Sequence, residues 1–235
     1  MELIYIIIGW VFVNNYVLSQ FLGLCPFIGV SKKTPAAVSM GLAVTFVLTM
    51  DSFVTFPIYV YFIQPGPQNL FYSLTSSFGF GGAAEFIKTY GLSEVLTTGS
   101  FILVIAALVQ LVEMVIRKTS KPLYDSLGIY LALITTNCIV LAVPLNNLKQ
   151  IKPGGDWVGK SFPEGLMWAT ISGLVAGLGF TLVMLLMSGV RERLAITKLP
   201  KPFQGIPIVF ISAALMGLAF FGFTGIITGL KANLG

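Results

Sequence analysis

The chain alternates long apolar runs with short polar breaks. An α-helix needs about 20 apolar residues to cross a bilayer, and runs that are apolar throughout favour helices over a barrel of alternating strands. The pattern predicts an all-α integral membrane protein with six transmembrane helices. The predicted spans are about 3–30, 36–63, 97–116, 124–146, 163–189 and 205–230. The breaks are SKKTP (31–35), RKTSKP (117–122), NNLKQIKPGGDW (146–157) and RERLAITKLPKPFQG (191–205).

Residues 64–96 depart from this alternation. QPGPQNL (64–70) opens as a loop, and SSFGFGGAAEF is too rich in glycine for a confident span. A seventh span here would have to contain Glu85 and Lys88. We therefore predict a loop or interfacial insertion between the second and third spans.

Composition and charge agree with a membrane protein. Hydrophobic residues make up 56% of the chain and charged residues only 10%, whereas soluble domains are about 25% charged. The first, third and fifth connections carry nine Lys and Arg residues and the opposite side carries five, which predicts both termini outside the cytoplasm. Such basic connections require no nucleic-acid partner. The apolar start, without a basic region or cleavage site, is interpreted as the first span and not as a signal peptide.

Two cysteines and no histidine limit the chemistry. The missing histidine excludes His-ligated haem, His-containing zinc sites and histidine acid–base catalysis. Cys25 lies in the first apolar run and Cys138 in the fourth. The single membrane domain, 1–235, therefore divides into two halves of three spans, 1–123 and 124–235. Because three is odd, such halves would be inverted repeats, with a site at their interface.

Both cysteine segments are predicted to be broken helices. Gly23 and Gly29 flank Cys25–Pro26, and proline removes one backbone hydrogen bond. The polar run 135–137 precedes Cys138 and can satisfy backbone groups that an unwound turn leaves free. Non-helical backbone at membrane depth is tolerated only where protein buries it or where it lines a cavity. Two such breaks would bring both sulfur atoms towards the repeat axis.

Several roles are open to two such thiols. They can be inert packing residues, form a disulfide, or ligate a metal. Zinc and iron–sulfur clusters normally take four protein ligands, of which this chain supplies two. The metal hypothesis therefore requires a partner chain, and its sharpest form is an iron–sulfur cluster shared across a subunit interface in the membrane. A redox-inactive transporter built from inverted repeats is the alternative, weakened by the shortage of polar groups at the midplane.

Several motifs resemble the RnfA/NqrE family of membrane subunits. The RnfA type belongs to the Rnf complex, an ion-translocating ferredoxin:NAD⁺ oxidoreductase, and the NqrE type of the Na⁺-translocating NADH:quinone oxidoreductase is the near alternative. GLCPFIGVSKK and VIRKTSKPLY are closer to the RnfA type. The resemblance covers nearly all spans and rests on VNNYVLSQFLGLCPFIGVSKK (13–33), FILVIAALVQLVEMVIRKTSKPLY (101–124), LGIYLALITTNCIVLAV (127–143), GLGFTLVMLLMSGVRERL (177–194) and PFQGIPIVFISAALMGLAFFGFTG (202–225).

The resemblance implies an electron-transfer subunit that is not catalytic alone. An inverted homologue, RnfE-like, would share one intramembrane 2Fe–2S cluster, with Cys25 and Cys138 as this chain's ligands. RnfB, RnfC, RnfD and RnfG would be further partners and would carry FMN or riboflavin and other iron–sulfur clusters. Electron transfer would be coupled to Na⁺ or H⁺ translocation across a bacterial or archaeal cytoplasmic membrane. Residues 64–91 and 147–160 depart from the family pattern as longer connections.

Two acidic residues are candidates for an ion path. Asp51 lies within the second span, where a charge is costly and is a functional hypothesis by default. The alternative places Asp51 at an interface or beside a buried polar partner. Glu113 lies four residues before Arg117, which also fits a structural ion pair at a helix end.

The remaining polar and glycine motifs have structural interpretations. Asn14 and Asn15 lie within the first span, where they could cap a helix or hydrogen-bond across helices, and packing is the favoured role. The glycine pairs of GLVAG (173–177) and GIITG (225–229) predict close helix contacts. VRERL (190–194) is expected to be a basic cytoplasmic helix end, with docking of a soluble electron donor as the alternative.

Overall fold

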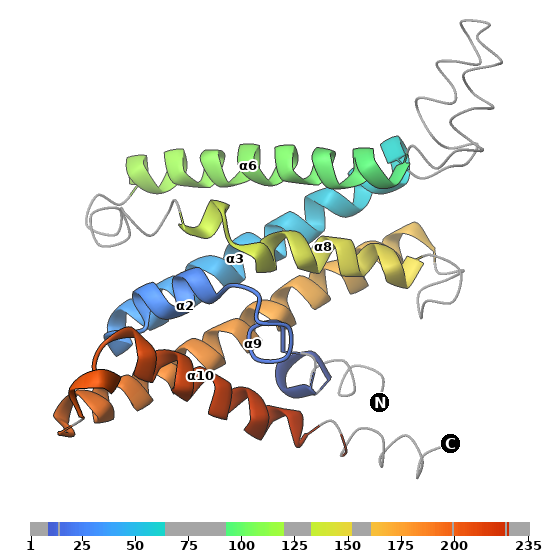
Figure 1. The fold of residues 1–235 in the computed structure, drawn as a ribbon. Helices are drawn as coiled ribbons and strands as arrows, with labels where there is room; N and C mark the ends of the chain where they lie inside the picture. Colours follow the sequence, from blue (N-terminus) through green and yellow to red (C-terminus); the bar gives the residue numbers. More distant parts are fainter. Residues whose placement is uncertain are drawn as a thin grey trace, which may run out of the picture.

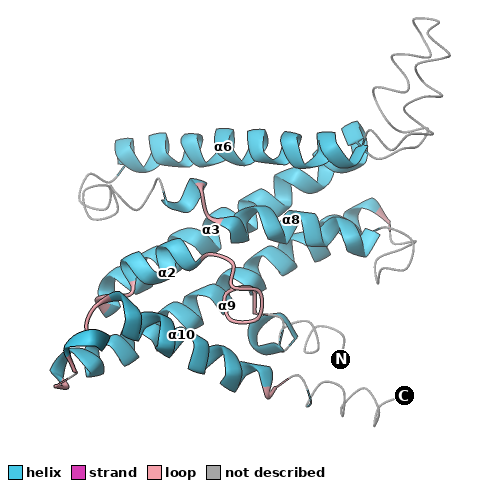
Figure 2. Ribbon diagram, viewed as in Figure 1, coloured by secondary structure: helices cyan, strands magenta, loops and turns pink. Residues whose placement is uncertain are grey.

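The computed structural model of the chain describes residues 9–13, 15–63, 93–119, 133–151, 161–198, 200–223 and 225. Within these ranges every regular element is helical (Figures 1 and 2). The predicted all-α class agrees with this. The 64–91 insertion and most of the 147–160 loop lie outside the described residues.

Six α-helices and three short helical elements are the main features of the described part, beside a further helical turn at 133–135. Two segments are long and apolar enough to cross a membrane, Thr34–Tyr61 and Phe162–Ile196, and Thr98–Met114 and Ile206–Phe221 are shorter apolar helices. The arrangement as six spans in two inverted repeats stays a prediction. The elements are η1 (Gly9–Val13), α2 (Leu24–Val30), α3 (Thr34–Ile58), η2 (Tyr59–Ile63), α6 (Ser93–Thr119), α8 (Cys138–Ile151), α9 (Phe162–Ile196), η3 (Lys201–Phe203) and α10 (Ile206–Phe221).

Helices α3 and α9 form an antiparallel pair at the centre of the bundle. At one end the Thr34 backbone N–H and hydroxyl donate to Glu192 at 2.9 and 2.6 Å. At the other end the Phe56 ring lies against Gly165. In Figure 1, α6 lies on one side of this pair and α10 on the other, with α8 packed against both α3 and α9.

Glycines on α9 set the close approach of this pair. A Cβ built at Gly173 would lie 2.5 Å from the Ser52 hydroxyl oxygen, and one at Gly177 would lie 2.5 Å from the Thr45 Cα. No side chain larger than hydrogen fits at either position without a shift of α3. The close contact predicted from GLVAG is therefore confirmed within the chain, whereas most of GIITG lies outside the described residues.

The first segment is held against α9 by one buried asparagine. The Asn15 side-chain amide donates to the carbonyls of Val11 (2.9 Å) and Gly179 (3.1 Å), and its Oδ1 accepts from the Val17 N–H (3.0 Å). These bonds satisfy backbone groups where the helix is interrupted. The hydrogen bond across helices that the sequence allowed for Asn15 is therefore present, and Asn14 lies outside the described residues.

One predicted break begins later than expected. The polar sequence from residue 146 was expected to leave the helix, but α8 continues to Ile151. Asn147 is buried there, and its Oδ1 accepts a hydrogen bond from the Ser172 hydroxyl at 2.6 Å. Because α9 supplies this partner, the amide is tolerated inside the bundle, and the helix does not stop at the first polar residue.

Candidate functional site

The first cysteine follows an interruption of the chain between η1 and α2. Residues 15–23 run through turns, and Gly23 has a left-handed backbone with φ of 78°. Helix α2 then begins at Leu24, so that Cys25 is its second residue. The sequence predicted a break opened by Pro26 together with the flanking glycines, and the break is present with Gly23 at it, but the part assigned to Pro26 is wrong. The break precedes Pro26, which lies in the first turn, where its missing N–H removes no helical hydrogen bond.

The second cysteine also lies at the start of a helix. A helical turn at 133–135 ends at Thr136, and α8 begins at Cys138. Asn137 Oδ1 accepts a hydrogen bond from the Ile139 N–H at 3.3 Å, as an N-cap residue does. The polar residue before Cys138 therefore satisfies a freed backbone group, as the sequence predicted.

The two interruptions touch each other. A Cβ built at Gly23 would lie 2.8 Å from Asn137 Oδ1. These residues precede Cys25 by two positions and Cys138 by one, so the starts of α2 and α8 adjoin. Both thiols are free and exposed. Asn137 is buried, and its side-chain nitrogen has no hydrogen-bond partner among the described residues.

An arginine at the polar end of α9 fastens the cysteine-bearing α2. Arg191 donates from Nη1 to the Ile28 carbonyl at 2.7 Å and to the Ser31 hydroxyl at 2.9 Å. The cation thereby binds the carbonyl end of the short helix. Neither sequence interpretation of VRERL, as a basic helix end or as a docking site, included this contact, because the sequence carries no local sign of a partner so far away along the chain.

The donor set at the two helix starts fits half of a soft-metal site. Thiolates are the ligands that iron–sulfur clusters take. Within the described ranges, no three His, Cys, Asp or Glu side chains gather closely enough to hold a metal ion. The exposure of both thiols leaves them open to ligands from another chain.

No described contact joins either acidic candidate, Asp51 or Glu113, to the helix starts that carry the cysteines. Asp51 lies on α3 and is 1% exposed, and both of its carboxylate oxygens are without a hydrogen-bond partner among the described residues. The buried polar partner that the alternative required is not found among the described residues, and the placement of Asp51 at a membrane interface stays a prediction. Glu113 is half-buried on α6. Its pairing with Arg117 stays a prediction.

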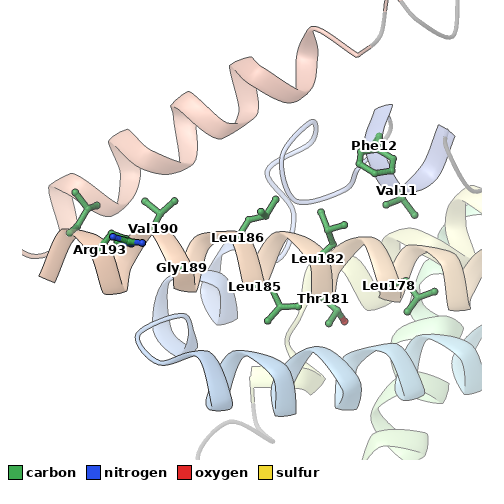
Figure 3. A pocket seen from close by; sticks show the side chains of 11 residues that line it. Val11, Phe12, Leu178, Thr181, Leu182, Leu185, Leu186, Gly189, Val190 and Arg193 are labelled. Atoms are coloured by element: carbon green, nitrogen blue, oxygen red, sulfur yellow. The ribbon is translucent and has the colours of Figure 1, made fainter. Parts of the chain in front are cut away.

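A separate apolar groove runs along α9 beside η1 (Figure 3). It has a volume of about 1030 Å³ and is lined by side chains such as Phe12, Leu182 and Leu186, with Arg193 towards one end. Neither cysteine lines it. The groove therefore offers apolar surface and no metal ligand.

Comparison with known proteins gives matches over nearly the whole chain. A family model described as "Rnf-Nqr subunit, membrane protein" matches residues 3–227. The A-type subunit of the Na⁺-translocating ferredoxin:NAD⁺ oxidoreductase complex of Acetobacterium woodii is 44% identical over 229 residues, covering 97% of this chain and 100% of the relative. The A-type subunit of the ion-translocating oxidoreductase complex of Ectopseudomonas mendocina is 44% identical over 226 residues (96% and 98%). The protein of the same name from Azoarcus sp. is 46% identical over 225 residues (96% and 97%).

Proposed function

Because the chain belongs to the Rnf-Nqr family of membrane subunits, we propose that it is the A-type subunit of an ion-translocating ferredoxin:NAD⁺ oxidoreductase complex. Relatives with this printed role match the chain along nearly its full length. In such a complex the chain is not catalytic alone. It relays electrons inside the cytoplasmic membrane, and this transfer is coupled to movement of Na⁺ or H⁺.

Within this role, Cys25 and Cys138 are proposed as half of the ligands of a 2Fe–2S cluster. The observation that supports this assignment is the contact of Gly23 with Asn137, because it brings together the starts of the two helices that carry the thiols. When bound, the cluster accepts and releases single electrons. An RnfE-like homologous subunit supplies the other two ligands, and the remaining Rnf subunits carry the flavins and other clusters.

The residues of this chain have distinct tasks in the proposed half-site. Cys25 and Cys138 provide thiolates on exposed helix starts, where a partner can cover them. Arg191 holds the far end of the Cys25 helix. Asn137 carries a buried side-chain N–H₂ group that is available to a sulfur acceptor, and hydrogen bonds to sulfur tune cluster potentials.

The experiment is iron analysis of the purified complex with Cys25→Ala and Cys138→Ala. Each variant is expected to lose about two iron atoms per complex, because a 2Fe–2S cluster needs all four ligands. Ferredoxin-dependent NAD⁺ reduction is expected to fall with the iron. Gly29→Ala is the matched control, since a Cβ at Gly29 on the same helix meets no atom within 4 Å. Full iron content in both cysteine variants would leave the thiols as packing residues and refute the assignment.

The orientation in the membrane belongs to the same proposal. The excess of Lys and Arg in the odd-numbered connections supports their placement in the cytoplasm and both termini outside. With this orientation, the polar end of α9, which contacts α2, faces the cytoplasm.

A further inference from the structure

A buried polar layer crosses the apolar contact between α3, α8 and α9. The Ser172 hydroxyl on α9 donates to Asn147 Oδ1 on α8 at 2.6 Å. The next residue on α9, Gly173, lies directly against the Ser52 hydroxyl on α3. Asp51 adjoins Ser52 along α3, and all four polar side chains are buried. Three helices therefore bring oxygen-bearing side chains to one level of the bundle.

Three oxygen atoms in this layer are unsatisfied. Asp51 is 1% exposed and Ser52 is 0% exposed. Both carboxylate oxygens and the Ser52 hydroxyl have no hydrogen-bond partner within the described part of the chain. Other hydroxyls on α3 do bond, such as Thr55 to the Asp51 carbonyl at 2.7 Å. Since buried polar groups are nearly always paired, unpaired oxygens on two consecutive residues mark this position as a candidate for ligand binding.

The chemistry of these atoms favours a metal cation over a proton. An isolated carboxylate in an apolar interior must be neutralised or paired. A proton on Asp51 would remove the charge but would leave the Ser52 hydroxyl without a partner. A hard cation binds carboxylate, hydroxyl and amide oxygens, so one ion can satisfy both residues.

The charge and the space restrict the ion further. Asp51 is the one charged side chain among the buried residues that the structure describes. A monovalent ion therefore balances the site, whereas a divalent ion would leave an uncompensated positive charge in an apolar interior. Because Gly173 brings α9 directly against the Ser52 hydroxyl, we take the smaller Na⁺ as the occupant and use K⁺ as the competitor in the test below.

We propose that Asp51 and Ser52, with Asn147 and Ser172 beside them, form a Na⁺-binding site between α3, α8 and α9. The site uses no cysteine, and it rests on the proposed coupling of electron transfer to Na⁺ or H⁺ movement, for which it names the ion and its ligands. It places a bound cation inside the membrane bundle, and Asp51 is the residue that supplies its negative charge.

The test is equilibrium binding of ²²Na⁺ to the purified, oxidised complex at constant ionic strength in choline chloride. Asp51→Asn keeps the shape and removes the charge, and it is expected to lose one bound Na⁺ or at least about tenfold in affinity. Ser52→Ala is expected to weaken binding several-fold. Ser39→Ala is the matched control, because its hydroxyl lies on the same helix and bonds to the Pro35 carbonyl. K⁺ is expected to compete weakly.

Two results would overturn the proposal. One is a wild-type complex that binds no Na⁺, and the other is unchanged Na⁺ binding in Ser52→Ala together with Asp51→Asn. If Asp51→Asn does not assemble, Ser52→Ala decides the question with the charge still present. Iron content is expected to stay at the wild-type value in Ser52→Ala, so failure of this site is distinguishable from failure of the cysteine assignment.

Discussion

Gly23 shows how much of the candidate site depends on one position without a side chain. Its backbone is left-handed, and the Asn137 amide occupies the place where a Cβ would be. Both conditions favour glycine, one through backbone strain and the other through space. The residue therefore fixes how closely the two cysteine-bearing helix starts approach.

Gly23→Ala is expected to reduce the iron content of the complex. An alanine with positive φ costs about 1–2 kcal/mol, and its Cβ would displace Asn137, which lies directly before Cys138. Iron per complex measures the effect. Gly29→Ala on the same helix is the control and should keep the wild-type iron content, since its Cβ meets open space. Equal iron in both variants would mean that this contact does not position the thiols.

Arg191→Ala is expected to loosen α2. A hydrogen bond from a charged group is worth about 1.5–3 kcal/mol, and Arg191 is partly exposed, so we expect the lower end of this range. Amide hydrogen exchange in residues 27–31 should rise about tenfold. Arg193→Ala, two residues further on the same helix, has an exposed side chain and should leave exchange at its wild-type rate. A similar effect of the two variants would contradict the anchoring role of Arg191.

At the scale of elements, the α3–α9 pair carries the central packing. Glycines at 173 and 177 allow contact between the backbones, and this pattern was readable in the sequence because small residues at a spacing of four share one helix face. What the sequence could not show was the partner helix. The spacing identifies a face but not the distant segment that packs on it.

Gly173→Ala is expected to destabilise this pair. The added methyl group would lie 2.5 Å from the Ser52 hydroxyl oxygen and 2.6 Å from the Leu48 carbonyl oxygen. Overpacking of this kind costs about 1–3 kcal/mol. The thermal unfolding midpoint of the complex should fall.

Gly189→Ala provides the matched comparison on the same helix. A Cβ at Gly189 meets nothing within 4 Å, and alanine is favoured over glycine in a helix by about 1 kcal/mol. The midpoint should therefore stay or rise. A fall of equal size in both variants would contradict the assignment of the effect to the α3–α9 contact.

At the scale of the whole molecule, hydrophobic patterning predicted more than local chemistry did. The all-α class predicted from this patterning is confirmed, as is the membrane family inferred from the motifs. The six-span inverted-repeat arrangement stays a prediction. Two predictions were wrong. Pro26 does not open the helix, because a proline is tolerated in a first turn. The break predicted at 146–157 starts later, because a polar residue is tolerated in a helix where another helix supplies its hydrogen-bond partner.

The contacts that build the candidate site were not readable in the sequence. Gly23 touches Asn137, and Arg191 bonds to Ile28, across large separations along the chain. The hydrophobic periodicity of a sequence reports only local structure. It can place these residues in a turn or at a helix end, but it does not show which distant residue each of them contacts. The need for a second chain in the cluster hypothesis, by contrast, followed from the number of cysteines alone, because two thiols are only half of a four-ligand set.

The most direct measurement is the EPR spectrum of the reduced complex with Cys25→Ser and Cys138→Ser beside wild type. Serine places a smaller oxygen ligand where the sulfur was. If the two thiols ligate the cluster, one 2Fe–2S signal is expected to shift or disappear in each variant. Signals from all other clusters should remain, which excludes general loss of assembly. A spectrum in which every cluster signal keeps its position and intensity in both variants would contradict the central claim that these two thiols hold half of a shared cluster.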